Sequence, residues 1–332
     1  MKDGYMVLVI ANDRIIEKVK SLSFGYFETS PINNNEYNNW TIICCDNNFN
    51  TNGYKKISVQ PLGEPENTML LNVNIKTIIF EHQLSEQWIV QNITRMVRAL
   101  LRLQCYESGA LFVHGGLVNY LDKGIAFIGH KKSGKTSSIL SLLSFDQTSF
   151  VSNDDISFSI QNDEWIAEGW PRSIVVRQDT LEVLCDQIEL DLEMLKHPLN
   201  KYNNENANNN TICFYPDEFS NIFSKSTMDK CSLNYLIFPC FSPRNESSAK
   251  LTRLSLDNAL NVLNNNILLN PEKYIDHLLP YFNLPNLLTL KDITRKIVSA
   301  IPCYSLEQSF SNLKEGSLKI QEMIKNDMNV FE

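Results

Sequence analysis

The chain has 332 residues, of which 43% are hydrophobic and 20% charged, and its formal net charge is −8. This composition is ordinary for a globular protein and allows one large domain or two of medium size. The acidic balance and the lack of a basic run argue against a nucleic-acid-binding protein. No window of about 18 apolar residues is present, so no membrane association is expected. Neither a signal peptide nor a C-x-x-C pair among the eight cysteines is found, so the cytoplasm is the expected location and a zinc site is not expected.

The first half of the chain predicts a β-rich region followed by alternating helices and strands. Residues 1–85 hold short apolar runs separated by turn-like segments, which predict a small β-rich N-terminal domain. Residues 86–104 carry apolar side chains at helical spacing and predict an amphipathic helix. Two strands are expected at 110–116 and 124–129, and a helix is expected at 135–145.

The second half continues this alternation and indicates an α/β fold. A strand that ends in the Asp-Asp pair is predicted within 148–160, and further strands are predicted at 233–241 and 301–308 (the last at a sheet edge). A strand pair or a strand and a loop is predicted at 163–177, and helices at 179–195, 255–270, 290–301 and 311–327. Two asparagine-rich segments, 33–40 and 203–210, offer nothing to bury and are expected to be loops.

The segment GHKKSGKT, residues 129–136, has two glycines that bracket four residues and are followed by a Lys-Thr pair. A predicted strand precedes it and a predicted helix follows, which is the context of a phosphate-binding loop. Backbone N–H groups of such a loop point at phosphate oxygens, Lys135 would reach the β- and γ-phosphates, and Thr136 would bind Mg²⁺. The candidate nucleotide-binding residues are Gly129, His130, Lys131, Lys132, Ser133, Gly134, Lys135, Thr136 and Ser137.

Two adjacent carboxylates, Asp154 and Asp155, follow the strand after the loop helix. In a fold with a phosphate-binding loop, this strand end lies beside the phosphates. One carboxylate can hold Mg²⁺ while the other accepts a proton from an attacking hydroxyl. The pair therefore suits phosphoryl transfer to an alcohol. The alternative is an ordinary turn, since Asn-Asp-Asp is also good turn chemistry.

Four further residues are weaker candidates. His114 ends the predicted strand before the loop strand, and it is equally compatible with a site residue and with a structural histidine. Arg172 can stabilise charge on a transferring phosphate, and Glu168 can contact a metal or substrate, although both also fit a surface turn. Arg244, after an apolar strand, is a candidate second cation facing the phosphates.

The order of these features between residues 111 and 156 resembles the HPr kinase/phosphorylase family. The shared order is a strand with a histidine, a second strand, the phosphate loop, a short helix and Asp-Asp. The likeness is closest to HPr-kinase-like peptide serine kinases encoded with peptide-modification genes, such as those of lasso-peptide pathways. Segment 168–177 resembles the Pro-Arg segment of these proteins. The resemblance extends over roughly residues 86–305 and is sharp over about fifty residues around the loop.

The resemblance implies an α/β fold with a P-loop core of the HPr kinase/PEP-carboxykinase-like type. Residues 86–332 would form the kinase domain and residues 1–85 the small β-rich N-terminal domain. It also implies transfer of the γ-phosphate of ATP, with Mg²⁺, to a serine hydroxyl of a peptide or protein. Asp154 resembles the general base with Asp155 on the metal side, or the reverse. His114 resembles the family histidine near the γ-phosphate.

Two departures from the family pattern bear on the substrate. Lys131 and Lys132 stand where the family usually has Ser-Gly, and segment 169–177 replaces the Gly-rich HPr-specific signature. The second departure argues against HPr as the substrate. Two alternatives stay open, namely a kinase of the same fold acting on a small-molecule hydroxyl, and a nucleotide-binding module that transfers no phosphate. The acceptor, the preference for ATP or GTP, and the oligomeric state, including a homo-oligomer as relatives form, also stay open.

Overall fold

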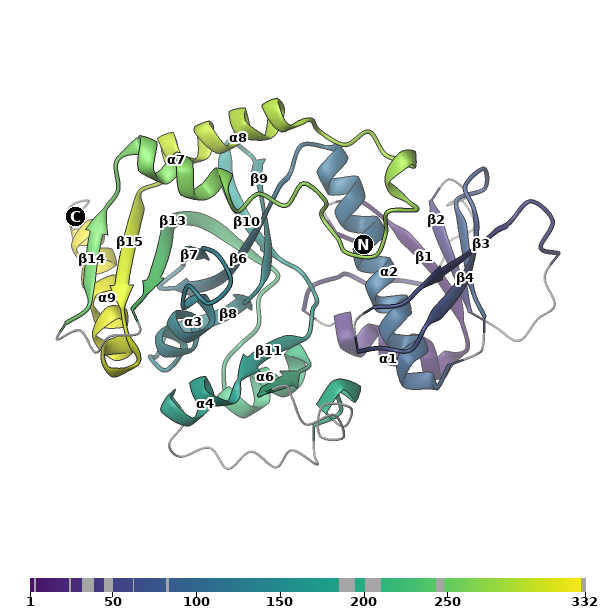
Figure 1. Ribbon diagram of the computed structural model, residues 1–332, viewed down its shortest axis with the longest axis horizontal. Helices are drawn as coiled ribbons and strands as arrows, with labels where there is room; N and C mark the ends of the chain where they lie inside the picture. Colours follow the sequence, from purple (N-terminus) through teal and green to yellow (C-terminus); the bar gives the residue numbers. More distant parts are fainter. Residues whose placement is uncertain are drawn as a thin grey trace.

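The computed structural model describes residues 1–2, 4–23, 25–31, 39–44, 50–61, 63–81, 84–184, 195–200, 210–242 and 248–329. These residues form a mixed α/β protein with two large β-sheets, and helix α2 (Glu86–Glu107) lies between them (Figure 1). Within the described ranges, no helix is long and apolar enough to cross a membrane. Arg244 and most of both asparagine-rich segments lie outside the described residues.

The N-terminal sheet has five strands in the order β1-β2-β5-β4-β3. Strands β1, β2 and β5 are parallel, and β5, β4 and β3 are antiparallel. Their bounds are β1 Val7–Ala11, β2 Trp40–Cys44, β3 Lys55–Val59, β4 Asn67–Asn72 and β5 Thr77–Phe80. Helix α1 (Asp13–Ser23) connects β1 to β2, and the sequence analysis did not predict it. The helix is short, and its buried residues Ile15 and Val19 are surrounded in the sequence by charged residues, so the apolar pattern is weak.

Helix α2 confirms the predicted amphipathic helix and joins the two halves of the chain. One hydrophobic core includes Ile42 of the N-terminal sheet, Leu100 of α2 and Leu236 of the second sheet. Because α2 is buried on most of its circumference, its side chains contribute to packing on both sides. A domain boundary at residue 85 stays a prediction.

The second sheet has eight strands in the order β10-β9-β6-β7-β13-β15-β14, with β8 paired to β6. Strand β13 runs parallel to both β7 and β15, whereas β6 runs antiparallel to β7. The start of β13 also pairs with β10, so the sheet curls back on itself. The bounds are β6 Leu111–Tyr120, β7 Lys123–Ile128, β8 Thr148–Ser152, β9 Asp155–Gln161, β10 Glu164–Gly169, β13 Lys230–Phe241, β14 Lys250–Arg253 and β15 Cys303–Gln308.

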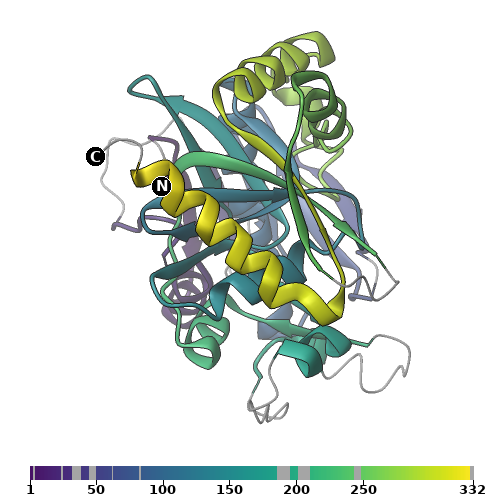
Figure 2. The same ribbon diagram turned by 90° about the vertical axis from the view of Figure 1, so that its left-hand side faces the viewer.

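The remaining elements cover this sheet. Helices α3 (Lys135–Leu143) and α9 (Leu313–Asn329) share a second hydrophobic core with one face of it, and Figure 2 shows α9 lying across that side. Helices α7 (Leu256–Asn264) and α8 (Leu287–Ala300) pack against each other (Figure 1). The other elements are β11 (Ile174–Arg177), α4 (Gln178–Leu184), β12 (Thr211–Phe214), α6 (Pro216–Phe223), and the short 3₁₀ helices η2 (Leu279–Tyr281) and η3 (Phe310–Asn312).

Two expectations about strand ends are wrong. Strand β6 continues past His114 to Tyr120, so His114 lies inside the strand and not at its end. The two glycines after His114 lie within the ladder, where β7 pairs with both. Strand β15 is an interior strand, because β14 pairs on its far side. The edge strand β14 is short and polar, which hides it from a search for apolar runs.

Candidate active site

The loop after β7 turns directly into α3. Lys132 and Gly134 have positive φ angles of 70° and 98°. Left-handed residues within a turn make successive backbone N–H groups converge into a concavity that suits anions. Both glycines of the motif also leave little room for a larger residue. A Cβ at Gly129 would lie 2.6 Å from the Ser133 hydroxyl, and a Cβ at Gly134 would lie 3.0 Å from the Phe241 ring.

Lys135, the first residue of α3, is buried and folds back on the loop. Its Nζ donates to the backbone carbonyls of Gly129 (2.6 Å) and His130 (3.0 Å). Burial lowers the pKa of Lys135 to about 8, although the charge of Asp154 opposes this effect. An ammonium group has three protons. Because the loop carbonyls take two, one proton remains to face an anion such as a phosphate.

The other loop side chains divide into two kinds. His130, Lys131 and Lys132 are exposed, whereas Ser133 and Thr136 are partly buried. The Ser133 hydroxyl is enclosed and has no hydrogen-bond partner within the described part of the chain. An enclosed polar atom without a partner is costly. The unpartnered Ser133 hydroxyl and the third proton of the Lys135 ammonium group both fit a loop that is shaped to hold a phosphate group.

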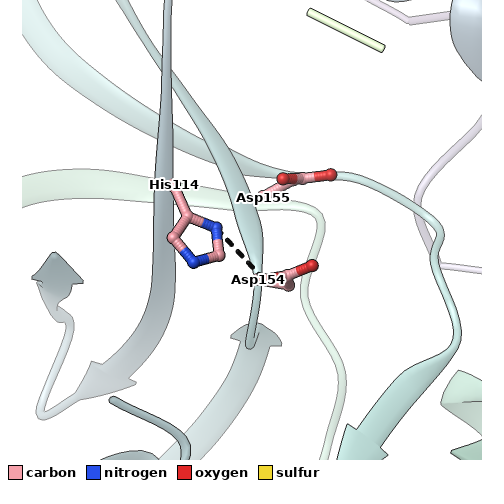
Figure 3. A group of neighbouring side chains, drawn as sticks. All are labelled: His114, Asp154 and Asp155. Atoms are coloured by element: carbon pink, nitrogen blue, oxygen red, sulfur yellow. Dashed lines mark ion pairs between the residues drawn. The ribbon is translucent and has the colours of Figure 1, made fainter. Parts of the chain in front are cut away.

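Asp154 lies in the bend between β8 and β9, and Figure 3 shows its carboxylate beside the His114 ring. Its Oδ1 lies 3.2 Å from His114 Nδ1, and its Oδ2 lies 3.1 Å from Arg172 Nη1. The backbone N–H of Gly115 donates to the Asp154 carbonyl at 2.9 Å. Strand pairing places these groups together, since His114 of β6 is the register partner of Asp155 in β9.

The His114 ring is half-buried beside Asp154. Burial lowers the pKa of His114, and the negative charge of Asp154 only partly opposes this effect. The ring is therefore neutral at pH 7, and the nitrogen that faces the carboxylate, Nδ1, carries the proton. The sequence was equally compatible with a structural histidine. The structure instead places the ring against one of the two candidate carboxylates.

Asp155 has a different environment from Asp154. Its side chain is 8% exposed, against 35% for Asp154. Its Oδ2 accepts from Arg102 Nη1 at 3.1 Å and also from Arg172 Nη1. Burial alone would raise the pKa of Asp155, but Arg172 and Arg102 outweigh it and hold the pKa well below its usual range. Asp155 is therefore a neutralised, buried anion, and Asp154 is the carboxylate that a substrate can reach.

Behind Asp155 lies a second ion pair that the sequence analysis missed. Glu272 Oε2 lies 2.6 Å from Arg98 Nε and 3.5 Å from Arg102 Nη1, and all three side chains are buried. Arg98 also donates to the Pro171 carbonyl at 2.8 Å, next to Arg172 in the chain. Although burial raises the pKa of Glu272, the guanidinium groups of Arg98 and Arg102 lower it to about 2. These contacts fix the segment that carries Arg172.

One sequence signal could have revealed this network. Arg98 and Arg102 stand four residues apart in an otherwise apolar stretch of α2, so both point from the same face of the helix. A charged side chain is almost never fully buried unless it is paired. Glu272 gave no such signal, because it lies in an irregular segment.

His114, Asp154 and Asp155 are a group that could hold a metal ion. One ligand atom from each lies within 4.8 Å of the others (Figure 3). Carboxylate oxygens are the ligands that Mg²⁺ prefers, and both guanidinium contacts to Asp155 use the same oxygen, Oδ2. Glu168 is not part of this group. It is buried in β10, where it accepts from Ser157 at 3.3 Å and Gln161 at 3.2 Å.

Comparisons with known proteins do not show a family for this chain. No family model matches the sequence, and no curated protein matches it. Among solved structures, the chain is similar to the HPr(Ser) kinase/phosphatase from Coxiella burnetii. The sequence identity is 11% and the TM-score 0.29, and the match covers 66% of this chain and 97% of that chain. At such values the chemistry of the site has to be inferred from its own geometry.

The loop and the carboxylate cluster act on each other electrostatically. The negative charge of Asp154 partly offsets the lowering of the Lys135 pKa by burial. The positive charge of Lys135 in turn contributes to the lowered pKa of His114. Strand β6 carries His114 beside the end of β7, where Gly115 pairs with Ile128 one residue before the loop. The geometry therefore combines a loop whose shape suits an anion, an accessible carboxylate and a guanidinium group. These are the groups that a phosphoryl transfer requires.

Proposed function

We propose that this chain is an ATP- and Mg²⁺-dependent kinase that transfers the γ-phosphate to a serine, or a similar hydroxyl, of a peptide or protein. Its P-loop core would be of the HPr kinase/PEP-carboxykinase-like type in residues 86–332, with residues 1–85 as the N-terminal domain. The observation that carries the proposal is the position of Asp154. This carboxylate is accessible, it faces both His114 and Arg172, and it interacts electrostatically with the loop lysine.

In the proposed reaction, the acceptor hydroxyl oxygen attacks the γ-phosphorus while the bond to the β–γ bridging oxygen breaks. The hydroxyl proton passes to Asp154, and ADP leaves with the electron pair of the broken bond. His114 Nδ1 contacts Oδ1 of Asp154 and orients the carboxylate, whose other oxygen, Oδ2, faces Arg172. Because Arg172 Nη1 lies between the two carboxylates, a small movement of this side chain would turn it toward the γ-phosphate.

The remaining residues supply binding and charge neutralisation. Lys135 and the loop N–H groups would hold the β- and γ-phosphates, with little covalent chemistry required of the protein. Mg²⁺, when bound, neutralises the charge that develops on the phosphate oxygens. The Thr136 hydroxyl and the Asp155 carboxylate would hold it. Glu168 is left out of this set, because its oxygens accept from Ser157 and Gln161.

Mass spectrometry tests the proposal directly. The protein is incubated with ATP, Mg²⁺ and a panel of serine-containing peptides, in parallel with Asp154→Asn. A matched control is Asp163→Asn, the same chemical change at an exposed turn between β9 and β10. We expect phosphate on a serine with the native protein and the control, and a loss of about 100-fold or more in rate with Asp154→Asn.

Other outcomes would favour the alternatives. Consumption of ATP without any gain of mass by the peptides would indicate a small-molecule hydroxyl as the acceptor. ATP that binds and stays intact under all conditions would indicate a nucleotide-binding module without phosphoryl transfer. An Asp154→Asn variant as active as the native protein would show that Asp154 is not the base.

A further inference from the structure

We infer that Phe241 and Phe310 form the platform on which the base of the nucleotide stacks. This inference rests on the proposed function, since it concerns the nucleoside end of the same ATP molecule. It assigns an aromatic base subsite to the carboxyl ends of β13 and β15, where the sequence shows no motif for reading a base. The ligand class is a purine nucleoside triphosphate.

The topology of the sheet gives the direction in which the nucleotide extends. Strand β6, with His114, pairs with one side of β7, and β13 pairs with the other side. A γ-phosphate that reacts near Asp154 lies on the β6 side of the loop. The α-phosphate and the nucleoside must therefore lead away from β6, toward β13 and then β15. Parallel strands β7, β13 and β15 all end at this edge, on the side of the sheet where the phosphate loop follows β7.

The two phenylalanines lie at this position. Phe241 is the last residue of β13 and the register partner of Gln308, and Phe310 begins η3 two residues later. The rings meet edge to face, with centroids 4.6 Å apart and planes at 70°. The Phe241 ring also lies against the loop, because a Cβ at Gly134 would come within 3.0 Å of it. The platform thus connects the phosphate loop to the surface.

The exposure of the pair is what makes a stacking surface available. Phe310 is 38% exposed even though it packs against Phe241. Stacking needs no polar recognition, because every base has a π-face, and its contribution to affinity is about tenfold or more per base. A phenyl platform therefore binds adenine and guanine to a similar degree. This expectation addresses the choice between ATP and GTP that the sequence leaves open.

Isothermal titration calorimetry separates the base from the phosphates. The full chain, with Mg²⁺, is titrated with ATP, GTP and inorganic tripolyphosphate. Phe310→Ala is compared with Phe310→Trp, which keeps an aromatic face, and with Tyr281→Ala, which removes another exposed aromatic ring in η2. Lys135→Ala reports on the phosphate loop.

We expect Phe310→Ala to weaken ATP and GTP binding about tenfold while tripolyphosphate binding is unchanged. Phe310→Trp and Tyr281→Ala should bind ATP like the native protein. If Lys135→Ala weakens ATP binding and Phe310→Ala does not, the assignment of the base-stacking platform is wrong and the proposed function stands. Equal losses of ATP and tripolyphosphate in Phe310→Ala would also overturn it, because the ring would then only support the loop. A native protein that binds no nucleotide overturns both.

Discussion

Replacement of Glu272 by glutamine tests whether the buried ion network behind Asp155 is a source of stability. The substitution removes one negative charge and keeps the size of the side chain. Glu272 is paired with Arg98 and Arg102, and all three side chains are buried. The variant therefore leaves two buried guanidinium groups short of one countercharge.

The magnitude follows from the pKa of Glu272. The fall from the ordinary value of 4.5 to about 2 in the folded protein corresponds to about 3 kcal/mol of folding free energy at neutral pH. Breaking a buried ion pair by removing one partner costs a similar amount, about 3–5 kcal/mol. With an unfolding entropy of about 2.1 cal/mol/K per residue over 332 residues, a loss of about 3 kcal/mol lowers the Tm by about 4 °C.

The assay is thermal unfolding followed by circular dichroism at several pH values. A matched control is Glu17→Gln, which breaks the exposed Lys20–Glu17 pair of α1, and its Tm should fall by less than about 1 °C. The folded pKa of Glu272 lies below the unfolded one, so its contribution is complete above pH 4.5 and is lost as the pH falls toward 2. The Tm difference between native protein and Glu272→Gln should therefore be constant from pH 7 to pH 5 and shrink below that range.

A Glu272→Gln variant with the native Tm at pH 7 would refute this reasoning. A Tm difference that grows as the pH falls would refute the sign of the linkage. In the first case, the charges of Arg98 and Arg102 would have to be compensated by groups other than Glu272. In the second, the pKa of Glu272 in the folded protein would lie above its value in the unfolded chain.

Three further changes address the site itself. Lys135→Ala should reduce ATP affinity by about 100-fold or more in calorimetry, whereas Lys132→Ala, at an exposed position, should reduce it by less than about tenfold. Gly116→Ala should lower the free energy of unfolding by about 1–3 kcal/mol in urea titrations, since its Cβ would lie 2.8 Å from the Ser152 carbonyl. Arg172→Lys should slow phosphoryl transfer by about 100-fold in single-turnover kinetics with ATP affinity retained. Both carboxylates contact the same atom, Arg172 Nη1, and an ammonium group has no second nitrogen that could face the γ-phosphate while the first keeps these contacts.

The sequence predicted the parts of the fold in which local pattern and tertiary burial agree. Helix α2 and strands β6 and β7 are long and strongly apolar, so their burial pattern could be inferred without knowledge of their neighbours. Helix α1 and strand β14 were missed because they are short and mostly charged or polar. Their formation depends on the neighbouring strands, which no local window contains.

The candidate site was predictable to the extent that it is contiguous in the chain. The loop and the Asp-Asp pair are local motifs. The sequence did not separate β9 from β8, so the pairing of β6 with β9, which brings His114 to Asp155, was not predicted. The difference between the two aspartates was not predictable. It depends on Arg102, which lies 53 positions away in the sequence and reaches Asp155 only through the packing of α2 against the sheet.

This difference also decides which carboxylate can act as a base. Asp155 is held ionised by two guanidinium groups, so it is a poor proton acceptor, and a proton placed there would leave Arg102 and Arg172 without their shared partner. Asp154 contacts only one guanidinium group, that of Arg172, and the neutral ring of His114 lies on its other side. If Arg172 turns to the γ-phosphate, both aspartates lose this cation, but Asp155 keeps Arg102, so Asp154 becomes the more basic of the two. For the order that the sequence left open, we therefore propose Asp154 as the proton acceptor and Asp155 as the group that positions Arg172. Asp155→Asn should accordingly impair both stability and transfer, whereas Asp154→Asn should impair transfer alone, which thermal unfolding and single-turnover kinetics on the same two variants would distinguish.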